Sequence, residues 1–139
     1  MKNIVVRNNT FQGTDAGLRF KSAVKRGGKS ENIYIDHIYM TDITGDAITF
    51  ETTYFDNHVG AKQQAAPVKQ EFLPDFQDIH ISNVYVRGCK NGIVAHGAEG
   101  MIHDITIKDS NIFYNKNAKD IDAACKITLE NVNFSTFAK

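Results

Sequence analysis

The sequence predicts an all-β protein, a β-solenoid in which the strands of successive coils stack as parallel ladders. A strand-like pattern with Ile at a fixed place recurs five times, and a second strand-like run lies in each interval. Period-two alternation, β-branched residues and Asn or Gly punctuation mark these runs as strands, and no window keeps a helical period. A β-sandwich is disfavoured because the one Asn-Gly pair, Asn91-Gly92, has flanking runs of unequal character.

The repeat has the consensus polar, Ile, any, aliphatic, any, usually Asn or Asp, two further residues and an apolar residue. Its five copies are 3–11, 32–40, 78–86, 104–112 and 126–134. They start 29, 46, 26 and 22 residues apart, so three intervals fit one coil and about four to five coils are expected. The second runs are 17–22, 46–51, 92–96 and 121–125. We expect aliphatic side chains to stack inside and corner Asn and Asp side chains to satisfy backbone groups of the turns.

The long interval contains a loop excursion at about residues 53–77, with Gly60 and both prolines, Pro67 and Pro74. We therefore expect residues 1–139 to be a single solenoid segment interrupted by this loop. A loop of this length is either a functional rim or a surface connection without a role, and the sequence favours neither.

Composition argues against several classes of function. With 16 basic and 16 acidic residues the formal net charge is zero, so no global field attracts nucleic acid. No apolar run is long enough to cross a membrane, and the N-terminus lacks the apolar region of a signal peptide. Cys89 and Cys125 form no CxxC motif and are expected to be small core residues. No HxxxH spacing occurs, and we expect neither a metal nor a cofactor.

The candidate binding face lies at the start of the stretch 17–40. Apolar and basic residues alternate in Leu18-Arg19-Phe20-Lys21, so a strand places Leu18 and Phe20 on one face and the two cations on the other. Arg19 and Lys21 are therefore directed at one place outside the core.

Several motifs follow one another in a fixed order along the chain. They are Arg19-Phe20-Lys21, Lys25-Arg26-Gly27-Gly28, and the runs 31–40, 78–84 and 97–107. This succession resembles glycoside hydrolase family 28, the polygalacturonases and their relatives, whose bacterial members carry an Arg-Ile-Lys strand, a Gly-Gly turn and an Asn-Ile run. Phe20 replaces the central Ile on the inward face, which should leave both cations in place. The resemblance covers nearly the whole chain and implies a right-handed parallel β-helix.

The same resemblance implies inverting hydrolysis by aspartates of Asn-Thr-Asp and Asp-Asp motifs, with a histidine in Gly-His-Gly, all N-terminal to the Arg-Ile-Lys strand. None of these motifs occurs in the 139 residues, since Asn9-Thr10 is followed by Phe11. We therefore expect the C-terminal coils of a polygalacturonase-like hydrolase, or a truncated relative, without catalytic residues. The resemblance also implies a secreted or periplasmic location.

Arg19, Lys21 and Tyr54 are the candidate substrate-binding residues. The resemblance implies that the two cations contact the sugar, and Arg grips a carboxylate bidentately while Lys supplies a compact charge. The alternative is an ordinary solvated ion pair, because in-register stacking places Lys21 beside Glu51. Tyr54 follows the second strand and either faces a sugar at the cleft edge or anchors the loop.

Other ionisable residues are weaker candidates. His96-Gly97 matches half of Gly-His-Gly, but it falls two coils too late, so an exposed or stacking histidine at a strand end is expected. Asp120 and Asp122 share a face, and Asp42 and Asp46 flank a turn. Inverting glycosidases need two carboxyl groups about 6.5–9.5 Å apart, one of them desolvated, and neither pair has a context that desolvates one member.

Three functions compete at this point. The chain is either a polygalacturonase-like part that keeps substrate-binding cations, a non-catalytic carbohydrate-binding solenoid, or a purely structural stack. The first two imply an acidic polysaccharide of galacturonan type as the partner, and none implies nucleic acid or a membrane. All three share an exposed solenoid end, which favours a homo-oligomer.

Overall fold

The computed structural model of the chain describes residues 2–23, 29–54 and 74–136. Every regular element of this part is a β-strand, as predicted. The strands are β1 (Lys2–Gln12), β2 (Leu18–Ala23), β3 (Lys29–Thr41), β4 (Asp46–Tyr54), β5 (Asp75–Phe76), β6 (Ile79–His96), β7 (Ile105–Ile121) and β8 (Ile127–Thr136). No helix in the described residues is long and apolar enough to cross a membrane.

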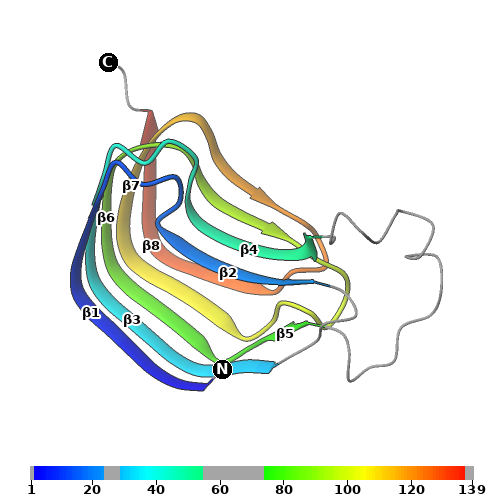
Figure 1. Ribbon diagram of the computed structural model, residues 1–139. Helices are drawn as coiled ribbons and strands as arrows, with labels where there is room; N and C mark the ends of the chain where they lie inside the picture. Colours follow the sequence, from blue (N-terminus) through cyan, green and yellow to red (C-terminus); the bar gives the residue numbers. More distant parts are fainter. Residues whose placement is uncertain (1, 24–28, 55–73, 137–139) are drawn as a thin grey trace.

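All strand pairings are parallel, and they form two main ladders. The first joins β1, β3, the first half of β6, the first half of β7, and β8. The second joins β2, β4 and the later parts of β6 and β7. Because β6 and β7 belong to both ladders, the sheet curls around a central core, as the nested ribbons of Figure 1 show. β5 adds a short pairing with the start of β3.

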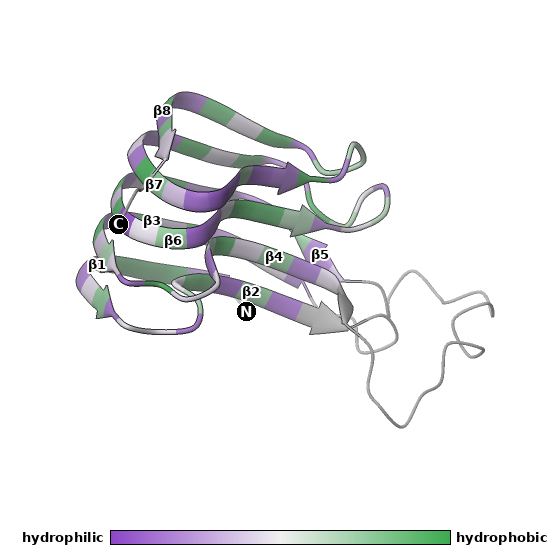
Figure 2. Ribbon diagram, turned by 90° about the horizontal axis from the view of Figure 1, so that it is seen from above, coloured by the Kyte–Doolittle hydropathy of each residue, from purple (hydrophilic) through white to green (hydrophobic). Residues whose placement is uncertain are grey.

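The aliphatic positions of the repeat fill this core. Ile33, Ile79, Ile105 and Ile127 pair in register, and the first three are at most 2% exposed. Figure 2 shows the resulting alternation of apolar and polar residues along the strands. Burial of these stacked aliphatic side chains is the main stabilising contribution, and the sequence predicted it correctly.

The Asn and Asp positions of the repeat are its corners. Positive φ angles occur at pairs of positions five residues apart in four of the five copies, which include Asn3 with Asn8 and Asp78 with Asn83. Asn and Asp tolerate this left-handed conformation better than other side chains. Their side chains also bond to one another across strands, as in Asn131 Nδ2 to Asp109 Oδ1 at 2.9 Å. The sequence predicted that these side chains satisfy backbone groups of the turns, whereas the structure shows side-chain hydrogen bonds between strands at the corners.

Two expected elements differ from the structure. The fourth of the second strand-like runs was predicted at 121–125. The strand that pairs with β6 there is the end of β7, with Asn117 opposite Asn91 and Ile121 opposite Ala95. The polar sequence of residues 115–120 hides its strand character because that part of β7 is largely exposed. The excursion at 53–77 contains the short strand β5, and its residues 55–73 lie outside the described part of the chain.

Candidate functional site

The polar candidates gather on the outer face of the second ladder, which we call the β2–β4–β6–β7 face. One row on it runs from Arg19 through Thr49 and Val94 to Asp120, and a neighbouring row runs from Lys21 through Glu51 to His96. Parallel in-register pairing brings residues 26 to 101 positions apart onto one surface. The sequence predicted the pairing of Lys21 with Glu51 correctly.

Aromatic packing beneath this face holds its first two strands in register. Phe20 stacks on Phe50 with ring centroids 4.7 Å apart and planes 7° from parallel. Phe76 of β5 packs edge-on against both rings, at 6.1 and 6.2 Å. Phe20 is 6% exposed, so it points inward as predicted and leaves its two basic neighbours on the outer face. Offset and edge-on aromatic pairs stabilise beyond the area they bury.

Arg19 makes the lateral ion pair of this face. Its Nη2 lies 3.2 Å from Glu51 Oε2, with 43% of the Arg19 side chain and 29% of the Glu51 side chain exposed. The sequence predicted a lateral pair of Lys21 with Glu51, and the two residues are adjacent in register. The structure shows Arg19 as a partner of Glu51. Such an exposed pair contributes little stability and is easily exchanged for another partner.

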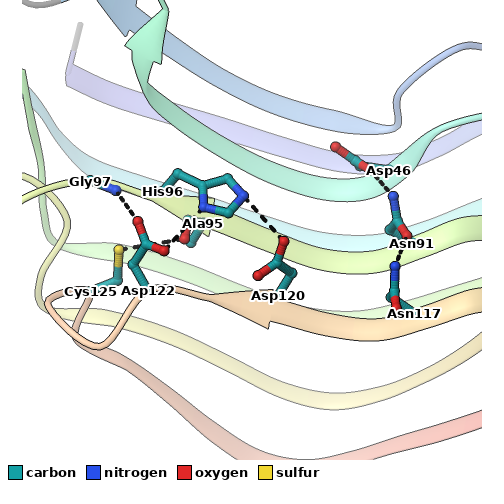
Figure 3. A network of polar contacts seen from close by, with 9 residues as sticks. All are labelled: Asp46, Asn91, Ala95, His96, Gly97, Asn117, Asp120, Asp122 and Cys125. Atoms are coloured by element: carbon teal, nitrogen blue, oxygen red, sulfur yellow. Dashed lines mark hydrogen bonds and ion pairs between the residues drawn. The ribbon is translucent and has the colours of Figure 1, made fainter.

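His96, at the end of β6, lies between two carboxylates at the other end of the same face. Its Nδ1 is 3.2 Å from Asp122 Oδ1 and its Nε2 is 3.4 Å from Asp120 Oδ2 (Figure 3). Asp122 Oδ2 also accepts a hydrogen bond from the Gly97 N–H at 3.0 Å. The histidine is half-exposed at a strand end, as predicted, and the shared face of Asp120 and Asp122 was also predicted.

This carboxylate pair is poorly suited to acid–base hydrolysis. The Asp120 and Asp122 side chains are 62% and 45% exposed. A general acid in a glycosidase is usually kept protonated by an apolar, desolvated site, which neither side chain has. The geometry supports hydrogen bonding and charge recognition on this face.

The third candidate, Tyr54, is described only through its backbone. It ends β4 and pairs with Ala23 across a register shift. Its side chain lies outside the described part of the structure, so its predicted contact with sugar stays a prediction.

A second outer surface, on the first ladder, was not predicted. Tyr34 stacks on His80 at 4.9 Å, and Tyr39 stacks on Tyr85 at 5.5 Å. A depression of about 300 Å³ lies beside the first pair. The alternation of the repeat placed these side chains outward, but only the strand register shows which aromatic rings stack.

The two cysteines are free and buried, which agrees with the prediction that they are core residues. Burial, followed by the negative charge of Asp46, raises the pKa of Cys89 to about 12. Burial, followed by the charge of Asp122, also raises the pKa of Cys125. On the first ladder, hydrogen bonds from Asn83 and then His37 lower the pKa of Asp36.

The fold and face together define an all-β chain of stacked parallel strands with a charged outer face. Residues 1–136 match the family described as glycosyl hydrolases family 28. The chain therefore belongs to glycosyl hydrolase family 28, and the resemblance seen in its motifs is confirmed. No curated protein matches the sequence. The family is that of polygalacturonase-like glycoside hydrolases, whose substrates are acidic polysaccharides.

Proposed function

We propose that this chain is the substrate-binding, C-terminal part of a polygalacturonase-like hydrolase that cleaves galacturonan-type pectin with inversion. Arg19 and Lys21 contact the acidic sugar, and Tyr54 borders the same cleft. The observation that carries this proposal is the placement of both cations on one outer face within a chain that belongs to the family. Arg19, 43% exposed and held by a surface ion pair, is available to a carboxylate of the substrate.

The catalytic carboxylates are not among these residues. The family's Asn-Thr-Asp, Asp-Asp and Gly-His-Gly motifs are missing from the sequence. Asp120 and Asp122, which share the face with Arg19, are too exposed to replace them. We propose that the chain binds the substrate without cleaving it.

The architecture we infer is a right-handed parallel β-helix of about four to five coils over residues 1–139. Its support is the all-parallel pairing, the use of β6 and β7 in two ladders, and the repeat spacing of 29, 26 and 22 residues. The fold implied by the family is a right-handed parallel β-helix with closed coils, which agrees with the architecture we infer. In such a fold the β2–β4–β6–β7 face runs along the helix axis and forms the floor of the binding cleft.

Calorimetry with an oligogalacturonate on the native chain and on an Arg19→Ala/Lys21→Ala variant tests the binding role. We expect binding by the native chain and a loss of at least about tenfold in affinity for the variant, because two charge-assisted contacts are removed. An Arg87→Ala/Lys108→Ala variant is the matched control, because it removes one arginine and one lysine from the first ladder instead. It should bind as well as the native chain.

A reducing-sugar assay on polygalacturonic acid tests the catalytic part of the proposal. The isolated chain should release no reducing ends. Turnover would show that catalytic groups are present after all. Absence of heat with every variant would remove the binding role and favour the purely structural stack.

A further inference from the structure

A small depression lies on the β2–β4–β6–β7 face beside the Arg19–Glu51 pair. Its volume is about 130 Å³. The residues that line it are Asp15, Ala16, Arg19, Gly45, Asp46, Thr49 and Glu51. It combines three carboxylates, one guanidinium and one hydroxyl at the place where β2 and β4 run side by side.

Thr49 contributes an unsatisfied hydroxyl to this depression. The side chain is 1% exposed, and its Oγ1 is the buried side-chain polar atom without a hydrogen-bond partner among the described residues. Two other buried hydroxyls of the described residues are paired. Thr52 Oγ1 donates to the His96 carbonyl at 2.7 Å, and Ser110 Oγ donates to the Lys108 carbonyl at 2.9 Å. A buried hydroxyl that loses water without gaining a partner is costly, which points to a partner supplied from outside the described residues.

The Arg19–Glu51 pair stands beside this hydroxyl. Arg19 is opposite Thr49 in register, and its guanidinium reaches diagonally to Glu51, two residues further along β4 and on the same face. The pair is partly exposed and therefore easily exchanged. A ligand that takes Arg19 away from Glu51 opens a path to Thr49 Oγ1 and releases a carboxylate to accept a hydrogen bond.

The charged residues that line the depression determine which kind of chemical group can bind in it. Asp15, Asp46 and Glu51 outnumber Arg19, so a second anion inside the depression is disfavoured. A metal ion is disfavoured by the guanidinium, and the described residues hold no cluster of three or more suitable ligands. A neutral hydroxyl fits, because it donates to a carboxylate and exchanges a hydrogen bond with Thr49.

We propose that Thr49, with the carboxylates of Asp46 and Glu51, forms a subsite for the ring hydroxyls of the sugar unit whose carboxylate contacts Arg19. Thr49 is then a specificity-determining residue that recognises the uncharged edge of the sugar. This inference rests on the proposed function, because it needs a uronic-acid unit at Arg19.

The test is an amide-resolved NMR titration with trigalacturonic acid and with its methyl ester, on the native chain and on Thr49→Val. The ester keeps the ring hydroxyls and lacks the charges. Thr49→Val should weaken both ligands by a similar factor, about threefold to tenfold, because one hydrogen bond is lost. Arg19→Ala should instead weaken the acid more than the ester. The folded variant should be as stable as the native chain or more stable, since an unsatisfied hydroxyl is removed.

Thr52→Val is the matched control, because it changes another buried threonine of β4 whose hydroxyl is already paired. It should lower stability, since it leaves the His96 carbonyl without its partner, and it should leave the ratio of the two affinities unchanged. Unchanged binding by Thr49→Val, with Arg19→Ala weakened, would overturn the subsite alone. A loss confined to the acid would overturn the assignment to hydroxyls. Failure of the native chain to bind trigalacturonic acid would remove the proposed function together with this subsite.

Discussion

The burial and the charged neighbours of each residue depend on its position within the strand stack. Cys89 shows this clearly, because its thiol is 1% exposed and close to the negative charge of Asp46. Burial disfavours the thiolate, and the nearby carboxylate disfavours it further. The result is a core residue that stays protonated, although its sequence neighbours, Gly88 and Lys90, are typical of a surface turn.

Cys89 should make stability depend on pH in the alkaline range. Its pKa rises from an ordinary 9.0 to about 12 in the folded chain. Between these values the unfolded thiol releases its proton and the folded thiol keeps it, so stability falls as pH rises. The free energy of unfolding in urea should therefore fall more between about pH 8 and about pH 10 for the native chain than for Cys89→Ala. Equal losses in both proteins would mean that Cys89 is not the group responsible.

At the scale of elements, strand pairing is fixed by the buried side chains beneath each strand and by close backbone contacts. The stack of Phe20, Phe50 and Phe76 ties β2, β4 and β5 together. Close backbone approach adds a second constraint, since a Cβ at Gly92 would press against the Ala118 carbonyl of β7. These contacts set the register that places Arg19 beside Thr49 and near Glu51.

Truncation of the central ring should destabilise the chain strongly. Phe50 is 0% exposed, so Phe50→Ala should cost about 3–5 kcal/mol of unfolding free energy, through lost burial and a residual cavity. Tyr39→Ala is the control, because Tyr39 also stacks on an aromatic ring but is 38% exposed. Its cost should stay below about 1.5 kcal/mol. Chemical denaturation measures both values, and similar losses would contradict the role given to the buried stack.

For the whole molecule, the two end strands differ from the middle. Within the described residues β1 pairs only with β3, and β8 pairs only with β7. Their inward side chains, Ile4 and Val6 on β1 and Leu129 on β8, are partly buried, whereas the equivalent Ile35 and Ile81 are at most 3% exposed. The parallel ladders therefore carry backbone groups and apolar surface at their ends that another strand can cover.

We expect the chain to self-associate through these ends. Light scattering over a range of protein concentrations should show a dimer or larger species, because each end gains strand pairing and apolar burial on contact. Lysine substitution of Val5, which is 60% exposed on β1, should shift the equilibrium toward the monomer. A well-behaved monomer at high concentration would argue against this association.

The sequence alone determined the all-β class and the parallel stacking, because the alternation within each repeat copy distinguishes buried from exposed positions. The ordered succession of motifs determined the family. Ile at fixed positions had to be buried, and Asn or Asp beside it marked the corners. The predicted alignment of Lys21 with Glu51 follows from the same alternation. Strand character at the end of β7 was missed, since exposed polar residues there carry no apolar period.

Only the tertiary structure decided which side chains meet across strands. Arg19 as a partner of Glu51, His96 between Asp120 and Asp122, and the unpaired hydroxyl of Thr49 all depend on contacts between residues at least 24 positions apart. Periodicity gives the direction of a side chain, but side-chain pairing depends on rotamers, register and the space left by neighbours. The sequence predicted the two cations of the charged face. The depression beside them, with its Thr49 hydroxyl, depends on the side-by-side packing of β2 and β4.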